Sequence, residues 1–276
     1  MKMRELNFLI LFIVATVLSG CSEFTRIQKN GSFEEKYEAA ITYYEKEDYY
    51  RAGLLFDDIR PYSSGKPNAE KILLYSAYCE YNEGSQYVAS YGFQKFYQTY
   101  PRNPQAQEAM FMYAESLYEI SPKANLDQEN TKNAIKAYES FLKRYPKTEY
   151  KDECNLKVAE LQTKLEFKAY ENAKLQFKIR HYRAAVMSFD NFIKRYPVSS
   201  YNEELTFLKI ESQLNYAKMS LERVMQDGKP VYLKKERLTV ATDYYREFID
   251  KYPNSKFVKQ AEGLYDTILH QLEQLS

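Results

Sequence analysis

The residue with the clearest chemical potential is Cys21, whose thiol could be alkylated. It ends the run Leu18-Ser19-Gly20-Cys21. Upstream lie a basic start, Met1-Lys-Met-Arg, and an apolar stretch from Leu6 to Leu18, which is the order of a secretory signal. The apolar stretch is shorter than the roughly 20 residues that cross a bilayer as a helix. We therefore predict that residues 1–20 are a signal peptide cut before Cys21, and not a permanent membrane span.

The sequence around this cysteine resembles the lipobox of bacterial lipoproteins. That resemblance implies a covalent diacylglycerol on the Cys21 thiol and an N-acyl lipid on the amine that cleavage frees. Several acyl chains on one cysteine anchor a protein stably, because each buried methylene contributes on the order of 0.8 kcal/mol. Residues 21–32 would then be a flexible, lipidated tether. The alternative is an ordinary secretory signal with a chance cysteine.

The other reactive side chains form no catalytic pattern. Cys79 and Cys154 lie in apolar helical patterns, so we expect buried free thiols, although an exported chain would permit a disulfide. His181 and His270 are the only histidines, which excludes a multi-histidine metal site, and we expect both at the surface. The sequence contains no phosphate-binding Gly loop, nucleophile elbow or His-Glu-x-x-His motif. We predict that the protein is not an enzyme and needs no metal or cofactor besides its lipid.

Composition and charge narrow the class of protein further. Tyr is abundant at 28 residues, whereas there are only 8 Gly and 9 Pro, which favours long amphipathic helices over sheets. The net charge of +1 argues against nucleic acid as a partner. A basic group near the C-terminus is expected to be a solvated face, with an acidic partner or lipid headgroups as the alternative. It consists of Lys229, Lys234, Lys235 and Arg237.

A repeated pattern dictates the elements that must position any site. Four segments end on Phe-x3-Tyr-Pro. In each segment an aromatic residue stands three positions before the Phe, and an Ala stands seven positions before it, as in Ala89, Phe93 and Phe96. These spacings place the Ala and both aromatic residues on one helical face, and the Pro ends the helix. Each copy predicts the second helix of a hairpin. The copies end at Pro101, Pro146, Pro197 and Pro253, and a degenerate copy with Ala52, Phe56 and Ile59 precedes them.

The set resembles tetratricopeptide repeats, with units longer than the usual period of about 34 residues. We predict an all-α, tetratricopeptide-like α-solenoid of about five helix hairpins plus a C-terminal capping helix after Pro253. Long first helices are expected between Glu149 and Arg180 and from about Asn202 to Gln226, with loops at 121–131 and 227–230. Residues 33–148 would hold repeats 1–3, and residues 149–276 would hold repeats 4–5 and the cap.

The first helices of such a solenoid line its concave side, and here they carry a largely aromatic set that we call the aromatic stripe. Tyr combines a broad apolar face and a hydroxyl with a low entropy cost, which suits binding of extended peptides. Packing between helices is the alternative for each residue. Counting from Ala40, Ala77 and Ala114, the aromatic stripe comprises Tyr37, Ile41, Tyr44, Leu74, Tyr78, Tyr81, Phe111 and Tyr118.

Lipobox, short tether, repeats and terminal helix together resemble the BamD family, lipoproteins of the outer-membrane β-barrel assembly machinery. The resemblance covers nearly the whole mature chain. It includes Tyr37-Glu-Ala-Ala40 in the first repeat, Ala77-Tyr78 in the second and Ala109-Met-Phe-Met-Tyr113 in the third. The first repeat departs from the pattern because Ser64 stands where its terminal Pro is expected.

This resemblance implies a lipid-anchored protein on the periplasmic face of the outer membrane. It implies that the N-terminal repeats receive the targeting strand of unfolded outer-membrane β-barrel proteins and that the C-terminal repeats dock on the periplasmic domains of BamA. We hypothesise that the strand contacts Tyr37, Tyr44, Tyr78, Tyr81 and Phe111. The competing interpretation keeps the fold and makes the protein a periplasmic repeat adaptor in envelope or cell-division maintenance. That class usually carries a coiled coil before its repeats, and none is visible before Phe33.

Overall fold

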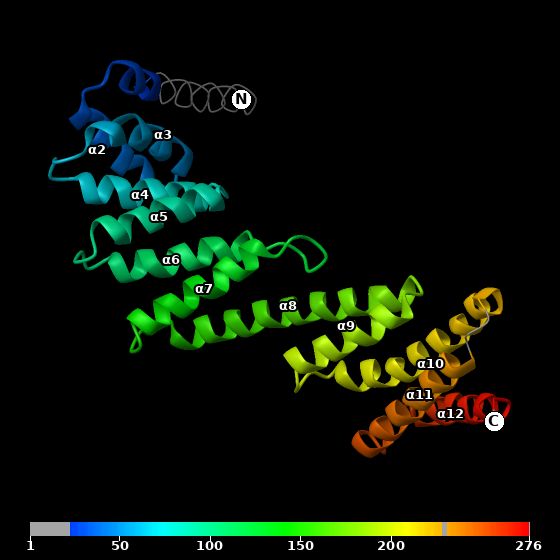
Figure 1. Cartoon of the computed structure of the whole chain (residues 1–276). Coiled ribbons are helices and arrows are strands. Elements are labelled where there is room, and N and C mark those ends of the chain that lie inside the picture. Colours follow the sequence, from blue (N-terminus) through cyan, green and yellow to red (C-terminus); the bar gives the residue numbers. More distant parts are fainter. Residues whose placement is uncertain (1–22, 228–230, 276) are drawn as a thin grey trace, which may run out of the picture. The chain divides into compact units, whose positions relative to one another are not determined.

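The computed structural model describes residues 23–227 and 231–275, and the elements of that part are helices (Figure 1). The signal peptide, Cys21 and Lys229 lie outside the described residues. Successive helices pair as hairpins in chain order, which confirms the predicted tetratricopeptide-like solenoid of five hairpins and a capping helix. The hairpins are α2 (Phe33–Glu45) with α3 (Tyr49–Ile59), α4 (Ala69–Asn82) with α5 (Gln86–Thr99), α6 (Ala106–Glu119) with α7 (Glu129–Arg144), α8 (Lys151–Lys178) with α9 (Tyr182–Arg195), and α10 (Asn202–Asp227) with α11 (Val231–Lys251), followed by α12 (Val258–Glu273).

The repeated pattern forms the contact face of each second helix. Ala52, Ala89, Ala134, Ala185 and Ala241 are all fully buried. An Ala at this point lets the partner helix approach closely, and the aromatic residues beside it fill the remaining space. The last Phe of each motif is buried as well, at Phe96, Phe141, Phe192 and Phe248.

The Tyr-Pro pair ends the second helix in the same way four times. In each copy the Tyr N–H donates to the carbonyl of the motif's last Phe, as from Tyr100 to Phe96 at 2.8 Å. The following Pro has no N–H and cannot extend the helix. The first hairpin ends differently, with the short 3-10 helix η1 (Arg60–Tyr62), whose Pro61 occupies its first turn. Pro61, three residues before Ser64, thus takes the place of the terminal Pro that this repeat lacks.

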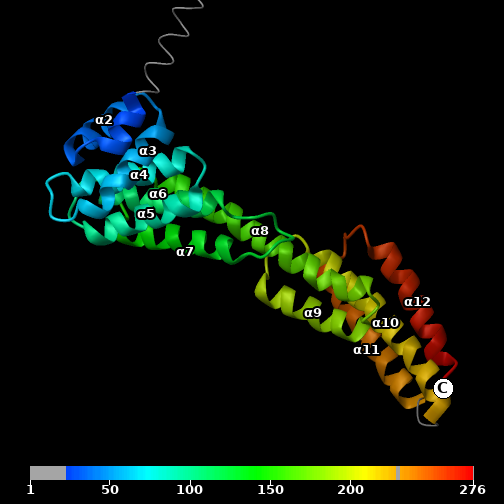
Figure 2. The ribbon, with the colours of Figure 1, turned by 90° about the horizontal axis from the view of Figure 1, so that it is seen from above.

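The chain divides into two compact units, residues 1–162 and 163–276, and the boundary falls inside α8. Figure 1 shows α2 to α7 stacked in chain order within the first unit and α9 to α12 in chain order within the second, and Figure 2 shows the same helices from above. The sequence interpretation divided the repeats at 148/149, before α8. The first half of α8 belongs to the first unit because Lys157 pairs with Glu115 of α6 and Tyr118 of α6 bonds Glu160 of α8.

The predicted flexible tether is wrong for the part that the structure describes. Residues 23–30 are helical, and Phe24 is nine-tenths buried against the first hairpin. Its ring meets the Tyr43 ring edge-on at 5.6 Å and lies 5.7 Å from the Arg51 guanidinium carbon. The segment ends at Gly31, whose N–H donates to the Ile27 carbonyl at 2.8 Å. Apolar burial of one aromatic ring therefore orders what composition alone indicated to be a linker.

A capping box then starts α2 directly after this segment. The Ser32 hydroxyl accepts from the Glu35 N–H at 3.1 Å, and the Glu35 carboxylate accepts from the Ser32 N–H at 2.9 Å. Both bonds satisfy amides that a helix start leaves unpaired. The chain therefore turns sharply from the helix at 23–30 into α2.

We expect Phe24→Ala to release residues 23–30 from the first hairpin, because removing a buried Phe ring costs on the order of 3–5 kcal/mol. Amide hydrogen exchange measured by mass spectrometry checks this, since peptides covering 23–32 should lose protection. Lys29→Ala is the matched control, because Lys29 is exposed on the same segment. Unchanged protection in Phe24→Ala would contradict the assignment.

Candidate protein-binding site

The structure divides the aromatic stripe into core residues and half-exposed residues. Leu74 is fully buried, and Tyr37 and Phe111 are 8% and 7% exposed. These three side chains pack between helices and leave almost no surface for a partner, so we correct their assignment to a binding surface. Ile41, Tyr44, Tyr78, Tyr81 and Tyr118 keep intermediate exposure, and these five form the exposed part of the stripe.

Neighbouring rings fix the orientation of the exposed tyrosines. Tyr44 of α2 stacks on Tyr75 of α4, with ring centroids 4.4 Å apart and an angle of 19° between the planes. Tyr78 meets Phe93 of the paired helix α5 edge-on, at 4.9 Å between centroids. These contacts restrain side chains that would otherwise lose rotamer freedom on binding. The stripe is therefore ordered before any partner arrives.

Carboxylates accept hydrogen bonds from the tyrosine hydroxyls of the first unit. Tyr78 donates to Glu108 of α6, and Tyr118 donates to Glu160 of α8 at 2.8 Å. Burial, reinforced by the bond to Glu108, raises the pKa of Tyr78 above its ordinary value. For Tyr118 the bond to Glu160 is the first cause of a raised pKa. The hydroxyls therefore remain protonated donors at neutral pH.

A buried Glu links three helices of the first unit. Glu115 of α6 accepts from the Tyr138 hydroxyl of α7 at 2.5 Å and pairs with Lys157 of α8. Lys157 also pairs with Glu153 at 3.0 Å. The ion pair compensates a carboxylate that is 7% exposed and would be costly to bury alone.

Sequence reasoning missed a second set of rings that stack on first helices. Tyr150 stacks on Phe111 at 4.1 Å between centroids, and Tyr201 stacks on Tyr170 at 4.0 Å. Phe257 stacks on Phe207 at 4.9 Å in the same manner. Each of these rings stands five positions after the Tyr of a Tyr-Pro ending, a signal that could have found them. The second repeat has Gln105 at this position and lacks the stack.

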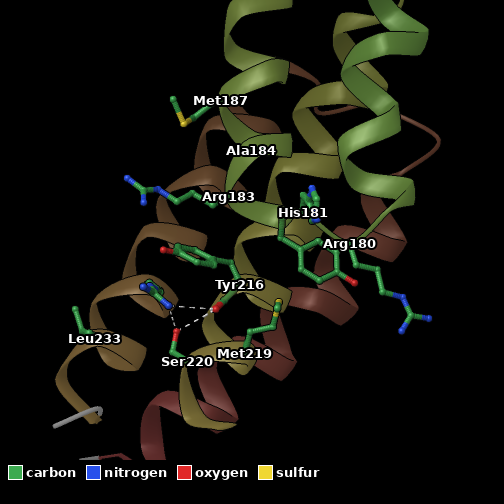
Figure 3. Close-up of a pocket in the computed structure, with 11 residues that line it drawn as sticks. Arg180, His181, Arg183, Ala184, Met187, Tyr216, Met219, Ser220 and Leu233 are labelled. Atoms are coloured by element: carbon green, nitrogen blue, oxygen red, sulfur yellow. Dashed lines mark hydrogen bonds between the residues drawn. The ribbon is translucent and has the colours of Figure 1, made fainter. Parts of the chain in front are cut away.

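A cavity of about 610 Å³ in the second unit was also missed (Figure 3). Its walls come from the α8–α9 turn, α9, α10 and α11. Three arginines line it, and its described lining contains no Asp or Glu. The Arg237 guanidinium lies 3.7 Å from the Tyr216 ring centroid and donates to the Ser220 hydroxyl. The full lining is Arg180, His181, Tyr182, Arg183, Ala184, Met187, Tyr216, Met219, Ser220, Leu233 and Arg237.

This cavity combines charge with exposed apolar surface. Met187, Met219 and Leu233 are among the exposed large apolar side chains of the protein. Flexible Met side chains adapt to the shape of a partner, and Arg supplies planar, multiply donating recognition of carboxylates. Arg180 and Arg183 make no ion pair with any described residue. The site therefore suits a protein segment that carries both an acidic and an aliphatic side chain.

The basic group predicted as a solvated face is only partly exposed. Lys234 is 8% exposed, and Arg237 is held by Tyr216 and Ser220. The solvated interpretation is therefore wrong for these two and holds for Lys235, which is exposed. Helix α11 turns Lys234 and Arg237 toward α10, because the two residues lie three positions apart on one face.

The predicted positions of the two internal cysteines and the two histidines agree with the structure. Cys79 and Cys154 are free and buried, and His181 and His270 are exposed. Among residues 23–227 and 231–275, no group of His, Cys, Asp or Glu is arranged to hold a metal ion. Within the same residues, no helix has the length and apolar character that crossing a bilayer demands.

Comparisons with known proteins identify related sequences. A family model named YfiO and described as outer membrane lipoprotein matches residues 29–227. A tetratricopeptide repeat model matches residues 231–255. The chain is 30% identical to the outer membrane protein assembly factor BamD of Caulobacter vibrioides over 171 residues, which are 62% of this chain and 54% of the relative. The match thus spans about half of that relative.

Another relative is matched over a larger share of its length. The outer membrane protein assembly factor BamD of Rickettsia prowazekii is 23% identical over 222 residues, which are 78% of this chain and 85% of that protein. Among solved structures, the complex of the TPR2AB domain of yeast Sti1 with pHSP90 aligns with 86% of this chain and 98% of its own, at a TM-score of 0.40 and 13% identity.

We expect both internal thiols to be unreactive in the folded protein. Burial raises the pKa of Cys79 to about 12 and that of Cys154 to about 11, so neither forms the nucleophilic thiolate at pH 8. In a Cys21→Ser background, Ellman's reagent should detect no thiol before unfolding and both thiols afterwards. Cys79→Ala should lower the unfolded count by one thiol. Fast reaction of the folded protein would contradict this burial.

Proposed function

The chain belongs to the BamD family of outer membrane lipoproteins, and from this premise we propose that it is a non-catalytic scaffold of the β-barrel assembly machinery. In this proposal a lipid on Cys21 anchors it to the periplasmic face of the outer membrane. Its first unit binds unfolded outer-membrane β-barrel proteins, and its second unit docks on the periplasmic domains of BamA. The observation that carries the proposal is the family match over residues 29–227.

The exposed part of the aromatic stripe supports binding of extended chains in the first unit. Tyr44, Tyr78, Tyr81 and Tyr118 come from three successive first helices. Their rings offer apolar contact and their hydroxyls offer polar contact, so the stripe tolerates varied sequences. Strands of barrel proteins alternate apolar and polar side chains, which matches such a surface. Because ring stacking and hydroxyl bonds already restrain these side chains, little entropy is lost on binding.

We expect the double substitution Tyr81→Ala and Tyr118→Ala to weaken binding of a barrel-protein targeting peptide about thirtyfold, because one binding hot spot contributes on the order of 2 kcal/mol. Fluorescence anisotropy of a labelled peptide measures this affinity, and circular dichroism verifies the helical fold. Tyr62→Ala is the control, since Tyr62 is 73% exposed and lies outside the stripe. Unchanged affinity in the double variant would sink this use of the stripe.

The cavity of the second unit supports docking on BamA. Arg180 and Arg183 flank apolar surface from Met187 and Leu233. A protein interface of this kind has an apolar centre and a charged rim. Rim charges set the association rate and the choice of partner, because they attract a surface of opposite sign.

We expect the double substitution Arg180→Glu and Arg183→Glu to reduce the BamA that co-purifies with the tagged, lipidated protein from detergent-solubilised outer membranes. Two charge reversals place like charges opposite an acidic partner surface. Lys194→Glu with Arg195→Glu is the matched control, because both residues are exposed on α9 outside the cavity. Equal losses in the two variants would refute this docking site. Wall or division proteins in place of BamA would favour the periplasmic adaptor.

A further inference from the structure

The docked N-terminal segment fixes where the chain emerges from the first unit. Glu23, the first described residue, stands two positions after Cys21. Phe24, directly after it, is buried against Tyr43 at the end of α2 and Arg51 at the start of α3. Further along the segment, Arg26 pairs with Glu35 in the first turn of α2 at 3.7 Å, and residues 31–32 lead directly into that turn. The segment therefore runs antiparallel to α2, and its N-terminal end lies beside the α2–α3 turn.

Exposed aromatic side chains gather at this same end of the first two hairpins. Tyr50 is 62% exposed at the start of α3, and Tyr87 and Tyr91 are 75% and 65% exposed on α5. Tyr50 and Ser85, which precedes α5, line one surface pocket, so the α2–α3 and α4–α5 turns are neighbours. Tyr87 and Tyr91 stand four residues apart, on one face of α5. We call Tyr50, Tyr87, Val88 and Tyr91 the turn-end tyrosine face.

The charges at this end restrict what can cover the face. Glu45 at the end of α2, Glu47 in the α2–α3 turn and Glu83 after α4 are exposed. Lys46 between the first two is exposed as well, so these three carboxylates outnumber the one lysine. These carboxylates repel a surface of anionic lipids and attract the ammonium groups of zwitterionic headgroups. Tyr prefers the interface between water and lipid, where its ring sits at the level of the headgroups. Both features suit a zwitterionic phospholipid surface.

We propose that the turn-end tyrosine face lies on the bilayer, so that the protein is held to the membrane in one orientation and not on a free tether. The inference rests on the lipidation of Cys21 in the proposed function. A lipid two residues before Glu23 leaves the first unit within a few ångströms of the membrane surface, because a residue spans at most about 3.6 Å. The order of 23–30 then selects which side of the unit faces the lipids.

The absence of Trp from the sequence provides a clean test. The lipidated Tyr87→Trp and Tyr62→Trp variants are each bound to phosphatidylcholine and phosphatidylethanolamine vesicles that contain phospholipids brominated near the headgroup end of the acyl chain. Tyr62 is the matched control, because it is 73% exposed at the opposite end of α3. We expect loss of fluorescence for Tyr87→Trp and none for Tyr62→Trp.

Four results would overturn the inference. Equal quenching of the two variants, or no quenching of Tyr87→Trp while the protein floats with the vesicles, refutes the orientation and leaves the anchor intact. Failure of the lipidated protein to float refutes the anchor of the proposed function and the orientation with it. The Cys21→Ser form of Tyr87→Trp should show no quenching, and quenching in that form would mean that the lipid does not determine the contact.

Discussion

The close approach of paired helices at a small residue is the constraint from which the rest of this structure follows. No hairpin of this kind can bury its apolar face alone, so consecutive hairpins must stack. Fully buried alanines in the second helices let the backbones come together, and the aromatic residue four positions later fills the neighbouring space, as at Ala89 and Phe93. In four of the five hairpins the Tyr-Pro ending stops the second helix at a fixed distance from its Ala, so the next hairpin, or the capping helix, begins in the same register.

Stacked rings and tyrosine-to-carboxylate bonds connect one repeat to the next. Phe111 with Tyr150 joins α6 to the residue that precedes the first helix α8, and Phe207 with Phe257 joins α10 to the residue that precedes the capping helix α12. Tyr170 likewise donates to Glu204 across 34 residues of sequence, and Lys174 pairs with the same carboxylate at 2.7 Å. Tyrosine thus serves both for packing between repeats and, in the proposed function, for recognition of a partner. The tyrosines that hold the repeats together also give the first unit its aromatic surface.

The two units are equipped differently. Both units carry tyrosine hydroxyls paired with carboxylates, and the second also carries arginines around an apolar cavity. In the second unit, Lys209 of α10 is almost fully buried and pairs with Asp190 of α9 at 2.8 Å and Glu247 of α11 at 3.3 Å. Burial alone would lower the pKa of Lys209, but the two carboxylates raise it above its ordinary value. The charged lysine thereby ties together three helices that also contribute residues to the cavity.

The sequence by itself determined the repeats, the hairpin count, the long helices α8 and α10 and the buried cysteines. These features depend on local spacing, since periodic apolar residues and Pro positions act within one or two helices. The tertiary structure alone decided which members of the aromatic stripe are buried. Tyr37, Leu74 and Phe111 share the spacing of their exposed neighbours, and only the packing of the next helix covers them. The tertiary structure also decided that Phe24 packs on the first hairpin and that Arg180, Tyr216 and Leu233 line one cavity. These arrangements bring together residues from different helices, and no local sequence pattern encodes their proximity.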